Sequence, residues 1–164
     1  MPQCAVMGAG SKKRIQEHLD RGWRQVGVRQ TWSGKFAPQT CELLEPKERE
    51  HYAKLDFGFT GRLWRDPQIP RETALEETRR FILESSGFFA HGDGFAIVNK
   101  KGNLMTVDLV GSLDHSARRI LTHAAFALGT KYMQAGTYED NLAALALYKK
   151  MGLKMVKREA VLHK

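Results

Sequence analysis

One segment of the chain, from Gly136 to Leu153, carries an asparagine and a tyrosine seven residues apart in a sequence with helical character. Seven residues make about two turns, so Asn141 and Tyr148 share a helix face and lie roughly 10 Å apart along its axis. A phenol both donates and accepts hydrogen bonds, and an amide offers two donors and an acceptor. Such a polar pair on an otherwise apolar face predicts contact with a partner.

Both residues also have structural interpretations. A lone tyrosine on an amphipathic helix is commonly a core aromatic with its hydroxyl at the rim, and an asparagine at a helix start is commonly an N-cap. Because short motifs often match by chance, the spacing of Asn141 and Tyr148 alone favours the structural interpretation.

The elements that position this pair alternate along the chain. Turn residues and the period of the apolar positions predict them. In order, they are a strand from Cys4, a helix Lys12–Arg21 with Ser11 as N-cap, a strand Trp23–Trp32, a helix Pro46–Lys54, an aromatic loop Phe57–Trp64, a helix from Pro70 to Ser86 with Gly87 as C-cap, strands Phe88–Ala90, Phe95–Asn99 and Leu104–Val110, a helix ending at Leu128, a strand Tyr132–Thr137, a helix Asn141–Met151 and a strand Leu153–Leu162.

Length and composition set the class. With 164 residues and 42% hydrophobic content, the chain fits one folded domain. No apolar run is long enough to cross a bilayer and the N-terminus lacks a signal-peptide pattern, which predicts a cytoplasmic protein with no membrane partner. Cys4 and Cys41 have no metal-ligand spacing, so two free thiols and no metal are expected. The net charge of +8 suits nucleic acid or the phosphates of a small cofactor, and does not choose between them.

The order of the elements, together with Asn141, Ala144, Tyr148, Gly152 and their neighbours, resembles the GCN5-related N-acetyltransferase (GNAT) family. The last helix of that family carries an N-x-x-A-x-x-L-Y-x-K-x-G-F pattern, and Leu153 replaces its final Phe. The segments Gly22–Thr31, Gly61–Glu72 and Val161–Lys164 are further similar to the branch that acetylates TDP-fucosamine.

This resemblance implies a mixed α+β fold, with a mostly antiparallel, splayed central sheet flanked by helices. It implies a single domain over residues 1–164, made of an N-terminal strand-helix-strand unit (1–36) and an acetyltransferase core (37–164). It also implies acetyl transfer from acetyl-CoA to the amine of a nucleotide-linked deoxyaminosugar. A homodimer is compatible with it.

The resemblance also implies roles for individual residues. Tyr148 corresponds to the general acid that protonates the departing sulfur, and Asn141 to a contact with the pantetheine arm or a water. The backbone of Asp108, Leu109 and Val110 corresponds to the strand that pairs with the pantetheine amides. Arg62 and Asp66 fall in a loop that corresponds to the substrate side; a surface salt bridge is the alternative.

The expected pyrophosphate loop departs from the family, which has glycines there. This chain has Leu113–Arg118 instead, with no glycine after Gly111. Arg118 and Arg119 in the first turn of a helix would oppose the helix dipole unless an anion were bound. The alternative is a helix that begins at Ser112, which would move both arginines away from its end. Ser112, His115 and Ser116 are further candidates for contact with the cofactor.

Two questions stay open in the sequence. The first is the general base, for which Asp108, His91, His115 and Glu139 are candidates of equal standing. The second is the function, since the same fold could acylate another amine, including one on a nucleic acid, or serve as a binding module without catalysis.

Overall fold

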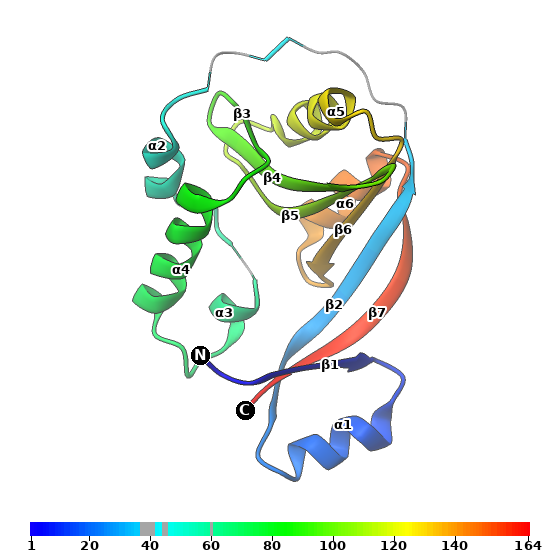
Figure 1. Ribbon diagram of the computed structural model, residues 1–164. Helices are drawn as coiled ribbons and strands as arrows, with labels where there is room; N and C mark the ends of the chain where they lie inside the picture. The colour runs from blue at the N-terminus through cyan, green and yellow to red at the C-terminus, as the bar shows by residue number, and fades with distance from the viewer. Residues whose placement is uncertain (37–41, 44–45, 60) are drawn as a thin grey trace.

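The computed structural model describes residues 1–36, 42–43, 46–59 and 61–164, and its elements follow the predicted order (Figure 1). They are β1 (Cys4–Gly8), α1 (Lys12–Leu19), β2 (Arg24–Lys35), α2 (Arg49–Lys54), α3 (Arg62–Arg65), α4 (Arg71–Glu84), β3 (Phe88–His91), β4 (Gly94–Lys101), β5 (Leu104–Ser112), α5 (Ala117–Leu128), β6 (Tyr132–Tyr138), α6 (Leu142–Lys150) and β7 (Lys154–His163).

The strands form one sheet in the order β1-β7-β2-β6-β5-β4-β3. All neighbouring pairs are antiparallel except β5 and β6, which run parallel. The predicted meander of β3, β4 and β5 is present. Strand β7 lies between β1 and β2, so the two strands that flank α1 in the sequence do not pair with each other. The expected mixed α+β fold, an open sheet flanked by helices, is confirmed.

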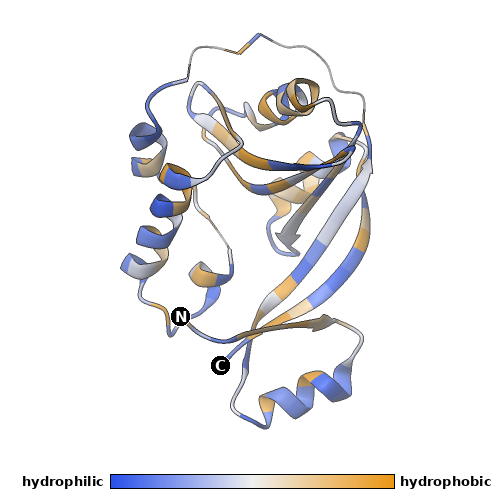
Figure 2. Cartoon of the chain, in the orientation of Figure 1, coloured by the Kyte–Doolittle hydropathy of each residue, from blue (hydrophilic) through white to orange (hydrophobic). Residues whose placement is uncertain are grey.

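Strand β4 lies between two hydrophobic clusters, because its successive side chains point to opposite faces of the sheet. Ala96 and Val98 point to one face of the sheet, where the buried residues of α5 and Tyr148 of α6 pack. Phe95 and Ile97 point to the other face, against α2 and α4. Figure 2 shows β4 and α6 with mostly hydrophobic residues, and α1 and α4 with mostly hydrophilic ones. Both faces of the sheet are therefore covered around β4.

A third, smaller cluster joins α1 to the other end of the sheet. Met7 of β1 and Leu162 of β7 are buried there, and Ile15 and Leu19 of α1 pack against them. The apolar side chains of α1 recur at helical spacing, which gives the short helix one face to bury.

Three local predictions need correction. Helix α2 begins at Arg49 rather than near Pro46, and the aromatic loop contains the short helix α3. Helix α4 ends at Glu84 with Ser85 at the C-cap position, so Gly87 is not its cap. Gly87 has φ +70° and lies so close to Val98 that a Cβ would be 1.9 Å from its carbonyl oxygen. Glycine is required there by close backbone approach.

In the described part of the chain, no helix is long and apolar enough to cross a membrane. The same residues include no group of three or more His, Cys, Asp or Glu side chains placed to hold a metal ion. Cys4 is exposed and free, whereas Cys41 lies outside the described residues.

Candidate active site

A bulge in β5 separates it from β6 and opens the site. Ile97 of β4 pairs with Leu109, but the next residue, Val98, pairs with Val107, so Asp108 is an extra residue in β5. Parallel pairing with β6 also ends at Val107, opposite Ala135. Because a bulge bends the strand that carries it, the two strands diverge from this point. Among the described residues, the part of β5 after Val107 pairs only with β4, so the backbone groups on its edge toward β6 are unpaired.

A cleft with a volume of about 1010 Å³ occupies the gap between the diverging strands. It runs from the bulge to the N-terminal end of α5 and along α6. Nine of the residues that the sequence singles out line it: Arg62, Asp108, Leu109, Val110, Ser112, His115, Arg118, Asn141 and Tyr148. The cleft thus brings together residues from four separate segments of the chain.

Asn141 and Tyr148 both line the cleft, as a shared helix face predicts. Asn141 is also the N-cap of α6, because its side-chain oxygen accepts a hydrogen bond from the Ala144 N–H at 3.3 Å. The Tyr148 side chain is 2% exposed and belongs to the hydrophobic cluster around α5. Burial raises the pKa of its hydroxyl to about 12. Asn141 is therefore an N-cap and Tyr148 a core aromatic, and both also line the cleft.

Helix α5 begins at Ala117, with Ser116 at the N-cap position. A helix start at Ser112 is therefore wrong, and Arg118 and Arg119 do lie in the first turn. Arg118 reaches the cleft, and Arg119 is not among the residues that line it. The backbone N–H groups of a first turn and a guanidinium beside them favour a bound anion.

The loop before α5 is held by a carboxylate instead of being opened by glycines. Asp114 accepts hydrogen bonds from the Ser116 hydroxyl at 2.5 Å, the Ser112 hydroxyl at 3.2 Å and the Asp93 N–H at 3.0 Å. Burial would raise the pKa of Asp114, but these hydrogen bonds outweigh it and hold the pKa at about 2.

His115 follows in the left-handed region, with φ 59°. Glycine adopts that conformation readily and other residues adopt it at a cost of roughly 1–2 kcal/mol. The loop therefore has a backbone conformation that favours glycine at a position where the sequence has none.

Asp108 is the carboxylate at the centre of the site. Burial raises its pKa, while a hydrogen bond from the Asn99 side chain acts in the opposite direction. A carboxylate with a raised pKa is suited to accept a proton. Of the other candidate bases, His115 lines the cleft, whereas Glu139 pairs with Arg158 and His91 does not line the cleft.

Besides Arg119, two predicted contacts lie outside the cleft. Asp66 is buried away from the cleft, where it pairs with Arg24 at 2.5 Å and accepts a hydrogen bond from His163 Nδ1 at 2.7 Å. Its predicted partnership with a substrate is not supported, because both carboxylate oxygens already have partners inside the protein. Ser116 is also buried, and its hydroxyl is bonded to Asp114 rather than turned to the cleft.

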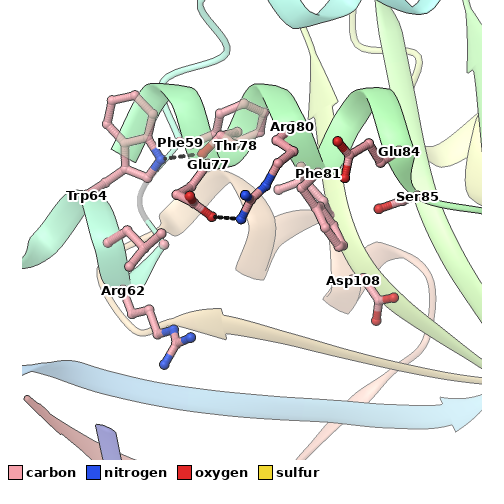
Figure 3. Close-up of a pocket in the computed structure, with 13 residues that line it drawn as sticks. Phe59, Arg62, Trp64, Glu77, Thr78, Arg80, Phe81, Glu84, Ser85 and Asp108 are labelled. Atoms are coloured by element: carbon pink, nitrogen blue, oxygen red, sulfur yellow. Dashed lines mark hydrogen bonds and ion pairs between the residues drawn. The ribbon is translucent and has the colours of Figure 1, made fainter. Parts of the chain in front are cut away.

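A second cavity, of about 510 Å³, joins the cleft beside α4 (Figure 3). The two share Phe59, Gly61, Arg62, Asp108 and Leu109. The remaining walls are side chains of α3 and one face of α4, and the ring of Trp64 is fixed by a hydrogen bond from its Nε1 to Thr78 Oγ1 at 3.0 Å. Asp108 is thus accessible from both sides.

Several residues of the site gave no usable signal in the sequence. Arg29 and Tyr138 line the cleft from β2 and β6, and Arg65 lies over the Tyr138 ring at 4.2 Å while it pairs with Asp140. Lys150, by contrast, matches the K of the family pattern, and it lines the same cleft from the end of α6. The aromatic loop was also visible in the sequence: its Phe57 packs on Phe95 and lines the cleft.

No protein-family model matches the sequence, and no curated protein matches it significantly. Solved structures do share the fold. A GCN5-related N-acetyltransferase from Sphaerobacter thermophilus is similar over 99% of this chain and 60% of its own, with 16% identity and a TM-score of 0.58. A functionally unknown conserved protein from Staphylococcus epidermidis is similar over 97% and 69%, with 11% identity and a TM-score of 0.64.

A GCN5-related N-acetyltransferase from Kribbella flavida is similar over 98% of this chain, with 15% identity and a TM-score of 0.52, but over only 42% of its own length. The chain therefore spans less than two thirds of both named acetyltransferases. At such low identity, these similarities show that the chain has the fold of GCN5-related N-acetyltransferases.

Proposed function

We propose that this chain is an acetyl-CoA-dependent N-acetyltransferase. The observation that carries the proposal is the divergence of β5 and β6 at the Asp108 bulge, which leaves an unpaired strand edge beside a buried tyrosine. The fold shared with N-acetyltransferases supports it. The cleft also fits the donor in size and charge, since Arg29, Arg62, Arg118 and Lys150 line it.

Each part of the cleft matches a part of acetyl-CoA. The unpaired edge of β5 from Asp108 to Ser112 would pair with the amides of the pantetheine arm, as a further strand does. The first turn of α5 and Arg118 would hold the pyrophosphate. Asn141, at the start of α6, lies beside the path of the arm.

The reaction needs an acid and a base, and the cleft offers one of each. Acetyl-CoA supplies a thioester carbonyl carbon; a nitrogen–carbon bond forms there and the carbon–sulfur bond breaks. Tyr148, with its raised pKa, is protonated at neutral pH and can give its proton to the departing sulfur. Asp108 can accept the proton that the amine loses, directly or through a water.

The identity of the amine is the finer part of the proposal. The sequence resemblance supports a nucleotide-linked deoxyaminosugar, with Arg62 as a contact for its phosphate. The alternatives are another amine, including a nucleic-acid-linked one, and a binding module that has lost catalysis. Arg62 is exposed and lines both cavities, so its position suits an anionic group of either the donor or the acceptor.

Calorimetric titration with acetyl-CoA tests the proposal directly. We expect saturable binding, and competition by free CoA, together with acetyl transfer to at least one class of amine. The amines to be assayed are TDP- and UDP-linked aminosugars, small free amines, DNA and RNA. Absence of binding at millimolar acetyl-CoA would rule out an acetyltransferase, and binding without transfer to any amine would favour the binding module.

A further inference from the structure

The two cavities that meet at Asp108 differ in the sign of their charge. Four cationic side chains and a single carboxylate, Asp108, line the cleft. In the smaller cavity, three carboxylates (Glu77, Glu84 and Asp108) face two guanidinium groups (Arg62 and Arg80). Charges that line a concave site select the charge of what enters it. The two cavities are therefore suited to different ligands.

The charges of the smaller cavity are not equally available. Arg80 pairs with Glu77 at 2.6 Å, so these two largely neutralise each other. Five residues line both the smaller cavity and the cleft. Among the other residues that line the smaller cavity, Glu84 is the one charged side chain that has no ion-pair partner in the described part of the chain. Figure 3 shows Glu84, Ser85 and Asp108 toward one end of the cavity and Arg62 toward the other.

Aromatic rings form much of the remaining wall. Phe59, Trp64 and Phe81 line the cavity, and Phe81 is 41% exposed although it is a large hydrophobic side chain. Rings of this kind bind apolar groups and also attract cations to their faces. The wall therefore suits an organic body with an ammonium group, and the one cation that it offers a phosphate without an ion-pair partner among the described residues is Arg62.

We propose that the smaller cavity is the acceptor site and takes a cationic amine with an apolar body, its positive charge held by Glu84 and Asp108, and without phosphate groups. This proposal rests on the acetyltransferase function. It assigns the cationic residues to the phosphates of the donor and the carboxylates to the acceptor, so it favours a small free amine over the nucleotide-linked aminosugar.

The test compares acceptors and variants. For the wild-type protein we expect kcat/KM for tyramine and spermidine to exceed that for a TDP-linked aminosugar. Glu84→Gln should raise KM for both cationic amines about tenfold, because a charge-assisted contact is lost, while kcat and the Kd of acetyl-CoA stay unchanged. Glu76→Gln is the matched control: it makes the same change on the same helix, and Glu76 is exposed and lines neither cavity.

A preference of the wild-type protein for the TDP-linked sugar, or equal KM values in the Glu84 and Glu76 variants, would overturn the acceptor assignment while leaving the acetyltransferase function intact. Failure to acetylate any amine would contradict the acetyltransferase function instead. In that case, NMR titration with spermidine still tests the cavity. Shifts centred on α4 that weaken in Glu84→Gln support the binding of a cationic amine in this cavity, and their absence overturns the proposal.

Discussion

At the scale of single residues, the proposed site depends on two side chains whose surroundings change their pKa values. Tyr148 is buried in the core yet reaches the cleft; its phenol is protonated at neutral pH, as a proton donor must be, although burial makes it a weaker acid. Asp108 stands out of its strand in a bulge, where burial makes its carboxylate more basic. Both side chains line the same cleft, so a proton donor and a proton acceptor are available to one reaction centre.

Tyr148→Phe tests the acid. We expect kcat to fall about a hundredfold, because general acid catalysis typically contributes at least that much, with the Kd of acetyl-CoA within about twofold of the wild-type value. The melting temperature should hardly change, since the described residues include no hydrogen-bond partner for this hydroxyl. Stopped-flow or steady-state kinetics and calorimetry give both numbers. An unchanged kcat would remove Tyr148 from the role.

The pH profile of kcat/KM tests the base. Asp108 must be ionised to accept a proton, so the rate should fall as the pH drops through its pKa, which is raised above the ordinary 3.8. Asn99→Ala removes the hydrogen bond that lowers this pKa, and should move the acidic limb to higher pH. Asp108→Asn should remove that limb and lower the rate. The same limb in all three proteins would contradict the role.

The residues that line the cleft were largely predictable, and those of the smaller cavity were not. Tyr148, Asn141 and Arg118 lie in local patterns that a sequence displays, namely a helix face and a helix start. Glu84 looks like any charged residue of an exposed helix face, and becomes part of a cavity only because α4 packs beside β5. Asp66 has a neighbouring arginine in the sequence, but its actual partners, Arg24 and His163, lie far along the chain.

At the scale of elements, the order of strands and helices and the pairing of β3, β4 and β5 followed from the apolar period and the turn residues, whereas the pairing of the longer strands and the irregularities did not. The residues around Asp108 do not predict a bulge, and the sequence of β7 does not predict that this strand lies between β1 and β2. The helix start of α5 depended on whether Asp114 would accept the hydrogen bonds of Ser112 and Ser116, a contact network that only the folded loop reveals.

Asp114→Ala tests whether this network prepares the loop for the donor. Without the carboxylate, the Ser116 hydroxyl and the Asp93 N–H lose their acceptor, and the conformation at His115 is no longer held. We expect the Kd of acetyl-CoA to rise about tenfold with kcat at saturation unchanged, as for the loss of uniform binding. Leu113→Ala, an exposed neighbour that does not line the cleft, is the control. Equal Kd values in the two variants would argue against the role.

At the scale of the whole molecule, one buried ion pair joins parts of the chain that are far apart in sequence. Asp66 follows α3, Arg24 begins β2 and His163 ends β7. The Asp66 carboxylate is fully buried; its ion-pair partner Arg24 is 25% exposed, and His163, which shares a hydrogen bond with Asp66, is fully buried. These contacts fix the segment that carries Arg62 and Arg65 against the long strands of the sheet.

Asp66→Asn should lower the free energy of unfolding by about 3–5 kcal/mol, the usual effect of removing one partner from a buried ion pair. Hydrogen bonds from Arg24 hold the pKa of Asp66 in the folded protein well below the ordinary 3.8. The ionised carboxylate therefore contributes its full stabilisation of the folded state above about pH 4. As the pH falls below that value, the unfolded chain binds a proton at Asp66 first, and the wild-type protein loses this stabilisation. Urea unfolding from pH 3 to pH 7 measures both effects. Asp56→Asn, an exposed change, should have little effect, and a pH-independent difference between wild type and Asp66→Asn would contradict the assignment.

The unpaired edge of β5 has a consequence for how such a chain can evolve. A ligand that binds to main-chain N–H and C=O groups does not require particular side chains along the strand, provided that the bulge is kept. Side chains along this edge can therefore change while the main-chain groups stay available to a ligand. The chain has the fold of two N-acetyltransferases at 15–16% identity, although no family model and no curated protein matches its sequence.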